Sequence, residues 1–427
     1  MPPDTVHIQP LNRPPDAVVT VPGSKSYTNR ALLVSAMASG TSRLSGALFS
    51  DDTRYMSEAL RRLGTDVDDD EAAARFTVTG TGGRIPVSGA ELYVGNSGTT
   101  CRSIISYVAH GRGRFVIDGD APMRQTRPIS DLLDALTQLG VDARSQNDNG
   151  CLPVVVQTNG FAGGRTRLDA SKSSQFLTAL MLTGPCTAAG LEIEMIGDLK
   201  TGYIDITMDV MRAFGAAVTH DDYRSFTIPG EQRYESRNYT VEPDASSASY
   251  FFAAAALSGG RIRVENLGVD SVQADLGFID VLEQMGCSIR RSASGIEVIG
   301  PPSLAGVDVD MRPMSDTFLT LAAIAPFADA PVAIRNIEHT RWQETDRIHA
   351  AVTELRRLGV RVDERQDGLT IFPSAITPAS VRTYEDHRVA MALALIGLRA
   401  PGVEIQDPGC VSKTFPTYFS VLDSIRR

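Results

Sequence analysis

Helical segments with one apolar face recur along the chain, and each ends in the same way. Five times an amphipathic stretch closes with Leu, Phe or Met followed by glycine, and a short strand-like stretch comes next. The glycines stand 71 to 76 residues apart, at Gly64, Gly140, Gly215, Gly286 and Gly359. Glycine just after the last helical residue is typical of a helix that ends in the left-handed backbone region. A sixth helix of this kind is predicted over residues 417–425, without the glycine.

A second kind of segment recurs in step with the first. Each copy has a polar start and continues as a helix rich in alanine and leucine, apolar almost all round, which indicates a buried helix. The six copies start at Ser24, Ser97, Ser171, Ser246, Ser315 and Asp386. Strand-like stretches lie between the helices, at residues 42–48, 114–119, 191–197, 261–267, 332–337 and 403–409.

The two patterns divide the chain into six α/β units of about 70 residues each. This period is too long for a simple solenoid, because each unit holds two helices and several strands. We therefore expect an α/β fold of two lobes with three units in each. One lobe is predicted to span residues 23–242. The other is predicted to combine residues 1–22 with residues 243–427, so that the first segment supplies a strand to it.

Composition narrows the class of protein. Of the 427 residues, 42% are hydrophobic and 22% are charged, which excludes a disordered or collagen-like chain. No apolar run of about 18 residues is present, so no membrane partner is expected. The five cysteines and six histidines are scattered, which argues against disulfides and against a bound metal. The first residues do not have the pattern of a secretory signal, which favours the cytoplasm.

The basic residues carry a sharper signal than the net charge. The net charge of -10 argues against a nucleic-acid partner. Only four of the 41 basic residues are lysines, at Lys25, Lys172, Lys200 and Lys413, and each stands at a predicted helix start. Helix N-termini offer free N–H groups and a partial positive charge. We interpret the lysines as ligands of phosphate or carboxylate, in one cleft on which the helix starts of both lobes converge.

At these positions the chain resembles the 5-enolpyruvylshikimate-3-phosphate synthase family. The motifs PGSKS, GNSGTTCR, RPI, SSQF, DASSASYF, ETDR, DHR and KTFP follow one another in the family's order. The resemblance implies two lobes, each an inside-out α/β barrel of three βαβαββ units. It also implies transfer of the enolpyruvyl group of phosphoenolpyruvate to the 5-hydroxyl of shikimate 3-phosphate, through a tetrahedral ketal and with release of phosphate. This step of aromatic amino acid biosynthesis needs cations, an acid and a base, and no cofactor is expected.

The resemblance further implies a role for individual residues. Shikimate 3-phosphate would contact Lys25, Ser26, Arg30, Ser173, Ser174, Gln175, Lys200, Tyr203, Asp316 and Gln343. Phosphoenolpyruvate would contact Lys25, Asn96, Gly98, Arg127, Gln175, Arg347, Arg388 and Lys413. The catalytic residues would be Lys25, Asp316 as base for the hydroxyl, and Glu344 as proton carrier for the methylene carbon.

Some of these assignments have an ordinary structural alternative. A carboxylate at a helix start, such as Asp316, is usually only a cap. Glu344 and Arg347 are expected one helical turn apart on one face, where a solvated ion pair would contribute little. Arg124 stands close to Arg127, and the RPI context favours Arg127 as the phosphate ligand.

The sequence departs from the family pattern at several positions. Gln343 stands where many relatives have a lysine, and we hypothesise that Lys200 or Lys172 supplies the missing charge. Gly98 leaves room for the inhibitor glyphosate in the phosphoenolpyruvate site, although Ser103 replaces a common proline. Trp342, the one tryptophan, is expected either to shield the site or to pack against the fold.

Three other functions are weighed against this one. A sister enzyme transfers enolpyruvyl to UDP-N-acetylglucosamine, but the cysteine it usually carries in a mobile loop is absent from residues 118–128. A non-catalytic phosphometabolite-binding protein of the same fold would have lost Asp316 and Glu344. RNA binding disagrees with the acidic charge. We expect a monomer with small-molecule substrates, whose lobes close around them.

Overall fold

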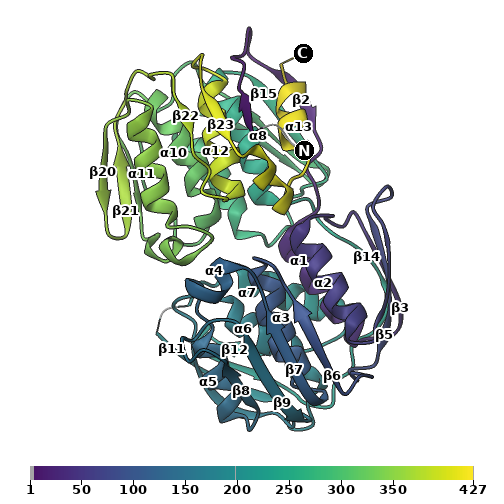
Figure 1. The fold of residues 1–427 in the computed structure, drawn as a ribbon. Helices are drawn as coiled ribbons and strands as arrows, with labels where there is room; N and C mark the ends of the chain where they lie inside the picture. Colours follow the sequence, from purple (N-terminus) through teal and green to yellow (C-terminus); the bar gives the residue numbers. More distant parts are fainter. Residues whose placement is uncertain (1–3, 198, 427) are drawn as a thin grey trace. The chain divides into compact units, whose positions relative to one another are not determined.

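The computed structural model of the protein describes residues 4–197 and 199–426. The chain divides into two compact units (Figure 1). The first, Gly23–Val241, is called the inserted unit below. The second, Met1–Pro22 with Glu242–Arg427, is called the terminal unit. Each unit buries a hydrophobic core of its own.

In its described residues, the inserted unit contains three mixed sheets of four strands. Its strands are β3 (Ser39–Ser45), β4 (Asp66–Asp70), β5 (Arg75–Thr81), β6 (Gly89–Tyr93), β7 (Arg112–Asp118), β8 (Asp142–Ser145), β9 (Val154–Asn159), β10 (Gly164–Asp169), β11 (Leu191–Ile196), β12 (Thr219–Asp221), β13 (Ser225–Ile228) and β14 (Asn238–Thr240). The sheet orders are β14-β3-β5-β4, β6-β7-β9-β8 and β10-β11-β13-β12.

The terminal unit contains two sheets of four strands and one of three. Its strands are β1 (Thr5–His7), β2 (Asp16–Val19), β15 (Arg261–Glu265), β16 (Ser288–Ser292), β17 (Gly295–Ile299), β18 (Asp308–Asp310), β19 (Val332–Arg335), β20 (Val362–Arg365), β21 (Gly368–Ile371), β22 (Ser380–Val381) and β23 (Glu404–Gln406). The sheet orders are β16-β17-β15-β2, β18-β19-β21-β20 and β1-β23-β22.

The sheets repeat one pattern of strand directions. Each four-stranded sheet has one parallel pair, such as β6 with β7, and the remaining pairs are antiparallel. The three-stranded sheet keeps the parallel pair, β22 with β23, and adds β1 in the antiparallel direction. This confirms the sixfold repeat. The first segment of the chain supplies two strands to the terminal unit, because β2 also pairs with β15.

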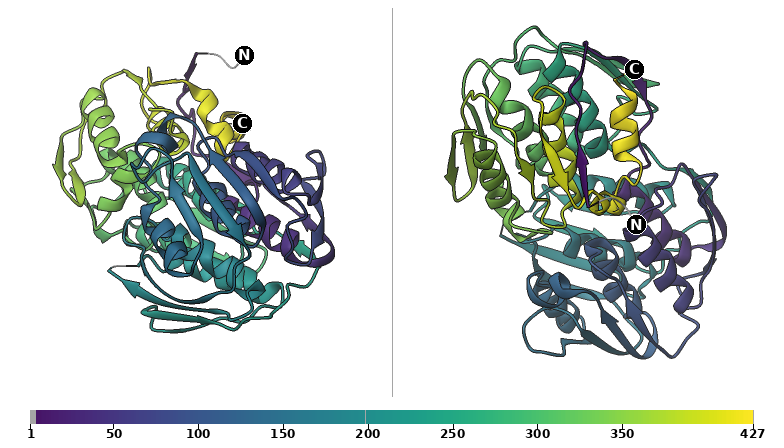
Figure 2. Two further views of the ribbon diagram at one scale, coloured as in Figure 1. Left: turned by 60° about the horizontal axis from the view of Figure 1, so that its bottom comes forward. Right: turned by 45° about the horizontal axis from the view of Figure 1, so that its top comes forward.

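Helices pack together in each unit, and the sheets cover them on the outside (Figure 1 and Figure 2). The helices of the inserted unit are α1 (Lys25–Met37), α2 (Asp51–Arg62), α3 (Gly98–Val108), α4 (Ala121–Gln125), α5 (Ser130–Gln138), α6 (Gln175–Thr183) and α7 (Gly202–Ala213). Those of the terminal unit are α8 (Ala245–Ser258), α9 (Phe278–Gln284), α10 (Phe318–Ile324), α11 (Arg347–Arg357), α12 (His387–Gly397) and α13 (Tyr418–Ser424). Helices α1, α3 and α6 contact one another, as do α8, α10 and α12. These six are the apolar helices of the sequence pattern, and their residues are almost all buried.

The glycines of the repeated helix ends adopt the predicted backbone conformation. Gly64 has a φ of 89° after α2, and Gly140 has a φ of 83° after α5. Gly215, Gly286 and Gly359 have φ values of 85°, 99° and 81°. Glycine enters this left-handed region without the steric cost that a Cβ brings.

The predicted starts of three buried helices differ from the observed N-caps by two or three residues. Helix α10 begins at Phe318 with Thr317 as its N-cap, after a 3-10 helix over Ser315–Thr317. Helix α8 begins at Ala245 rather than Ser246, because Asp244 caps it and accepts a hydrogen bond of 2.8 Å from the Ser247 N–H. Helix α6 begins at Gln175, well after Ser171, with Ser174 as its N-cap.

A bilayer sets a minimum length and apolarity for a helix that crosses it. Among the described residues, no helix is both long enough and apolar enough to do so.

Candidate active site

The first helix start of the inserted unit presents a lysine. Ser24 has an extended backbone, so α1 begins at Lys25. The Lys25 ammonium lies 3.5 Å from Oδ2 of Asp52, near the start of α2, and only 16% of the lysine side chain is exposed. A cation held at a helix N-terminus beside one carboxylate is suited to bind an anion of higher charge. Ser26 follows in the first turn, and its carbonyl accepts a hydrogen bond from Arg30.

Arg30 is buried and tied into the unit by its guanidinium. It donates to the Ser26 carbonyl, the Tyr203 carbonyl and the hydroxyls of Thr178 and Thr207, over 2.9 to 3.3 Å. These hydrogen bonds use four of its five N–H groups. Burial lowers the pKa of Arg30 to about 10, which still leaves it charged at neutral pH. Its main visible effect is to join α1, α6 and α7.

The start of α3 brings together a second group of hydrogen-bond donors. Ser97 caps the helix and accepts from the Thr100 N–H. Arg127 is buried and donates from Nη1 to both the carbonyl and the side-chain oxygen of Asn96, at 2.8 and 2.7 Å. Arg124 instead is exposed and bonded to Asp118, at 2.8 Å. Arg127 is thus buried beside the start of α3, whereas Arg124 is exposed.

The space around Gly98 shows which groups converge on the start of α3. A Cβ on Gly98 would lie 2.5 Å from Nη2 of Arg127, 2.9 Å from Nη1 of Arg102 and 3.0 Å from Oε1 of Gln175. Gln175 also donates to the Thr99 hydroxyl, at 3.2 Å. Two guanidinium groups and a helix N-terminus thus meet at one glycine, an arrangement suited to an anion, and the Gln175 atom nearest to this glycine is an acceptor oxygen. Sequence reasoning missed Arg102, although its position four residues after Gly98 places it on the same helix face.

The remaining predicted residues of the inserted unit lie around the starts of α6 and α7. Ser173 accepts from the Gln175 N–H at 3.3 Å, and Ser174 is the N-cap of α6. Lys200 is half-buried just before α7, near Tyr203 in its first turn. Lys172 is half-exposed and pairs with Asp131 at 3.1 Å.

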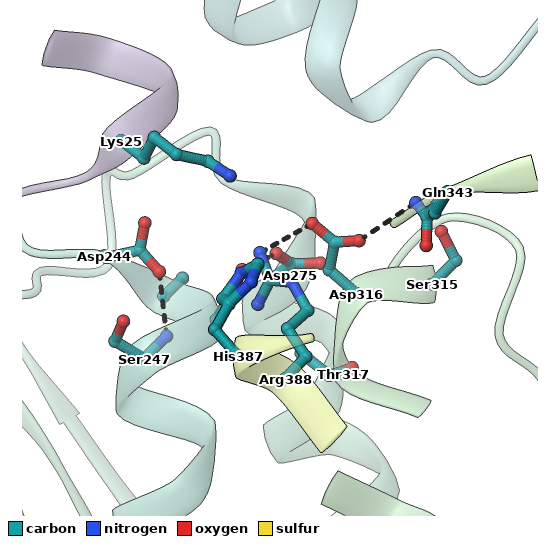
Figure 3. Close-up of polar contacts among 12 residues, drawn as sticks. Lys25, Asp244, Ser247, Asp275, Ser315, Asp316, Thr317, Gln343, His387 and Arg388 are labelled. Atoms are coloured by element: carbon teal, nitrogen blue, oxygen red, sulfur yellow. Dashed lines mark hydrogen bonds and ion pairs between the residues drawn. The ribbon is translucent and has the colours of Figure 1, made fainter. Parts of the chain in front are cut away.

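In the terminal unit, Asp316 is held by two arginines and an amide. Figure 3 shows Asp316 with one of these arginines, Arg388, and with the amide of Gln343. Arg388 donates from Nη2 to Oδ2 of Asp316 at 2.7 Å, and Arg347 donates from Nη1 to Oδ1 at 3.3 Å. Gln343 donates to the same Oδ1 at 3.4 Å. Asp316 belongs to the 3-10 helix Ser315–Thr317, and the N-cap of α10 is the next residue, Thr317. Both oxygens of the Asp316 carboxylate contact side chains of this cluster.

Glu344 lies between two cations. Its Oε2 accepts from Nη2 of Arg347 at 3.0 Å, and its Oε1 lies 3.0 Å from the ammonium of Lys413. All three side chains are at most 10% exposed, so the pair of Glu344 and Arg347 is not a solvated surface pair. The prediction that both stand on one helix face is wrong. Helix α11 begins at Arg347, because Asp346 caps it by accepting from the His349 N–H at 3.0 Å.

Arg347 is the centre of this cluster and is also bound by Asp386. The two side chains form a bidentate pair, with distances of 2.7 and 3.2 Å, and Asp386 also caps α12 by accepting from the Arg388 N–H. Burial opposes the charge on Arg347, but the charges of Asp386, Glu344 and Asp316 raise its pKa above the ordinary value. Sequence reasoning missed Asp386 as a partner, since a helix-capping Asp already has a sufficient structural reason.

The charges of the terminal-unit cluster balance within the chain. Three cations, Arg347, Arg388 and Lys413, contact three carboxylates, Asp316, Glu344 and Asp386. Several of these carboxylate contacts fall on the same guanidinium, so a bound anion can take over part of the coordination. The structure thus brings Asp316, Gln343, Glu344, Arg347, Arg388 and Lys413 together in one unit. It brings Asn96, Gly98, Arg127 and Gln175 together in the other.

Two further predictions concern Trp342 and metals. Trp342 is 61% exposed at the end of the 3-10 helix Glu338–Trp342, so a packing role is wrong. Within residues 4–197 and 199–426, no group of His, Cys, Asp or Glu side chains has an arrangement that could hold a metal ion.

Two solved structures share the fold of this chain. The EPSP synthase of Acinetobacter baumannii superposes with a TM-score of 0.83 at 24% identity, covering 99% of this chain and 98% of that one. The enolpyruvyl transferase NikO of Streptomyces tendae superposes with a TM-score of 0.76 at 19% identity, covering 99% and 96% of the two chains. The chain therefore has the fold of these two proteins.

The sequence comparisons define the family of the chain. The family model described as EPSP synthase (3-phosphoshikimate 1-carboxyvinyltransferase) matches residues 12–422. A 3-phosphoshikimate 1-carboxyvinyltransferase from a Nostoc species is 50% identical over 418 residues, which cover 98% of both chains. The chain belongs to the EPSP synthase family.

Proposed function

We propose that this enzyme transfers the enolpyruvyl group of phosphoenolpyruvate to the 5-hydroxyl of shikimate 3-phosphate, in the shikimate pathway. Membership of the EPSP synthase family supports this reaction. The observation that carries it is the buried cluster around Asp316 and Glu344, because it supplies two carboxylates for proton transfer beside three cations. A binding protein without chemistry would have no need to keep both carboxylates at this cost in desolvation.

Phosphoenolpyruvate carries a phosphate and a carboxylate, and we assign the carboxylate to the terminal unit and the phosphate to both units. The start of α3, with Asn96, Gly98, Arg127 and Gln175, is suited to the phosphate because N–H groups and guanidinium donors converge there. Lys413 would contact the same phosphate as it leaves. Arg347 and Arg388 would bind the carboxylate, since planar guanidinium groups match carboxylate geometry. Arg102 joins the phosphate ligands in this proposal.

Shikimate 3-phosphate would be bound mainly by the helix starts of the inserted unit. Ser173, Ser174 and Gln175 at α6 offer hydroxyl and amide groups, and Ser26 follows Lys25 at α1. The family assignment of Arg30 to the shikimate carboxylate leaves it one N–H group for that purpose, since the others are engaged within the unit. Tyr203, Lys200 and Gln343 complete the predicted set of contacts.

The proposed chemistry has two steps. In the first, the acceptor oxygen attacks C2 of phosphoenolpyruvate, a base takes the hydroxyl proton, and C3 receives a proton, which gives the ketal. In the second, the bond from C2 to the phosphate oxygen breaks and the methyl group loses a proton, which gives the enol ether. Asp316 is the proposed base, Glu344 the proposed proton carrier at C3, and Lys25 the cation that stabilises the reacting oxygen atoms.

We further propose that residues of both units act on one pair of substrates, that the lobes follow the division at residues 22 and 242, and that the enzyme works as a cytoplasmic monomer.

A phosphate-release assay tests the reaction. Release is expected with phosphoenolpyruvate and shikimate 3-phosphate together, and with neither substrate alone. Phosphate release with UDP-N-acetylglucosamine in place of shikimate 3-phosphate would favour the sister reaction instead.

A further inference from the structure

A buried carboxyl group lies beside the terminal-unit cluster, and the proposed chemistry does not use it. Asp275 belongs to the 3-10 helix Ala274–Gly277 and is 6% exposed. Its Oδ2 accepts a hydrogen bond from the Ser246 hydroxyl in the first turn of α8. Its Oδ1 is buried and has no hydrogen-bond partner among the described residues. A carboxylate in this situation is costly, and a neutral carboxylic acid is far less so.

This turn is fixed rigidly to the start of α8. Gln273, one residue before the 3-10 helix, accepts from the Ala245 N–H at 3.0 Å and donates to the Pro243 carbonyl at 2.8 Å. The same turn packs against α8, α9 and the 3-10 helix that carries Asp316. Asp275 therefore cannot move away from its charged neighbours without disturbing three elements.

The elements packed around Asp275 differ in the charges that they turn toward it. The 3-10 helix Ser315–Thr317 contributes Asp316, α12 contributes Arg388, and the N-cap of α8 contributes Asp244. Figure 3 shows the Asp275 carboxyl group next to the Arg388 guanidinium and to Asp316. The charged residues of α9, Asp280 and Glu283, pair instead with Arg291 on β16. Asp275 is thus a buried carboxyl group that lies beside the pair of Asp316 and Arg388.

We propose that Asp275 is a positioning residue that acts through Arg388. When Asp275 is protonated, Arg388 is available to contact Asp316 and the substrate anion. When Asp275 is ionised, its carboxylate competes with them for Arg388. Ionised Asp275 adds one negative charge next to the three cations and three carboxylates of the cluster. Burial, with the charge of Asp316 added, raises the pKa of Asp275 to about 7, against the opposing effect of Arg388. Asp275 therefore changes between its protonated and ionised forms near neutral pH. This inference rests on the proposed function for its kinetic consequence.

The first test follows the Asp275 proton without turnover. The protein is labelled with 13C at the aspartate carboxyl carbons, and the Asp275 signal is assigned by its loss in Asp275→Asn. The expected titration midpoint lies near pH 7, whereas an ordinary aspartate titrates near 4. In Arg388→Gln the midpoint should move up, because a positive charge that favours the ionised form is removed. An ordinary midpoint in the native enzyme, or an unmoved midpoint in Arg388→Gln, would overturn the proposal.

The second test measures the KM for phosphoenolpyruvate between pH 6.5 and 8.5, by phosphate release. In the native enzyme this KM is expected to rise about tenfold across the range through Asp275, as one added charge at short distance predicts. Asp275→Asn, which is neutral at every pH, should lose this rise and keep kcat within about threefold of native at pH 6.5. Asp280→Asn, on the neighbouring helix, is the matched control and should keep the native profile.

Ser246→Ala keeps the second test decisive if Asp275→Asn does not fold. It removes the hydrogen bond that favours ionised Asp275, so the rise in KM should begin at a higher pH than in the native enzyme. An unchanged profile in Ser246→Ala and Asp275→Asn would overturn the proposal, as would loss of activity at every pH in folded Asp275→Asn. A native enzyme that releases no phosphate would refute the proposed function instead, and the NMR titration would still decide the role of Asp275.

Discussion

At the scale of single residues, Gly98 limits what the phosphate-binding start of α3 can accept. A methyl group there would lie 2.5 Å from Nη2 of Arg127, so the guanidinium must move. We predict that Gly98→Ala raises the KM for phosphoenolpyruvate about tenfold, the loss expected when one charge-assisted hydrogen bond is weakened. Inhibition by glyphosate should weaken by at least the same factor, while the KM for shikimate 3-phosphate changes less than twofold. An unchanged KM for phosphoenolpyruvate would mean that this glycine does not line the site.

A second residue-scale prediction concerns the lysine that Gln343 replaces. Lys200 is half-buried just before α7 and close in sequence to Tyr203, whereas Lys172 is half-exposed and pairs with Asp131 at 3.1 Å. We favour Lys200 as the substitute because of this position and burial. Lys200→Ala should raise the KM for shikimate 3-phosphate about tenfold and affect phosphoenolpyruvate far less, as loss of one phosphate contact implies. Lys172→Ala is the matched control and should change either KM less than twofold. Equal losses for both substrates in Lys200→Ala, or none, would dismiss the hypothesis.

Sequence motifs predicted most of the residues that the structure brings together, and they failed where burial decides the role. Arg127 and Arg388 could be predicted because each stands in a short motif of fixed order. Asp275 could not, since its neighbour Ser246 is 29 residues earlier and nothing in the sequence marks either as buried. The packing role considered for Trp342 was wrong for the opposite reason, because a tryptophan is usually packed and this one is exposed.

At the scale of elements, the glycine that ends each amphipathic helix is open to a matched comparison. Gly140 has a φ of 83°, and a methyl group there would meet no atom within 4 Å, whereas a methyl on Gly64, at a φ of 89°, would meet the Pro86 ring at 3.0 Å. Both belong to the inserted unit. Gly140→Ala should cost about 1 kcal/mol, from backbone conformation alone. Gly64→Ala should cost more, because a rigid ring must also shift. Thermal unfolding checks this order, and a larger loss in Gly140→Ala would contradict it.

The six repeats could be predicted at this scale because periodic apolar faces are the strongest signal that a sequence carries. The helix starts were less accurate. Asp244 displaced the expected start of α8 by capping it, and Asp346 kept Glu344 outside α11. Several polar residues compete for each N-cap, and the one that wins is set by the direction in which the preceding chain arrives.

At the scale of the whole molecule, the proposal requires residues of both units to act on one pair of substrates. If each unit contributes cationic side chains to the binding of the same polyanions, the bound ligands should neutralise these positive charges and draw the two units together. We predict that shikimate 3-phosphate with glyphosate lowers the radius of gyration in solution scattering. Inorganic sulfate at the same ionic strength is the control and should change it less. A radius that stays the same with both substrate-site ligands would count against closure.

The most direct test of this central claim compares one arginine from each unit. Arg127→Ala in the inserted unit and Arg388→Ala in the terminal unit should each raise the KM for phosphoenolpyruvate at least tenfold, as loss of a charge-assisted contact predicts. Each should leave the KM for shikimate 3-phosphate within about threefold of native, because neither arginine is proposed to contact that substrate. Arg124→Ala, which removes an exposed arginine bonded to Asp118, is the control and should behave as native. If only one of the two units affected phosphoenolpyruvate, the claim that both act on the same substrate would be contradicted.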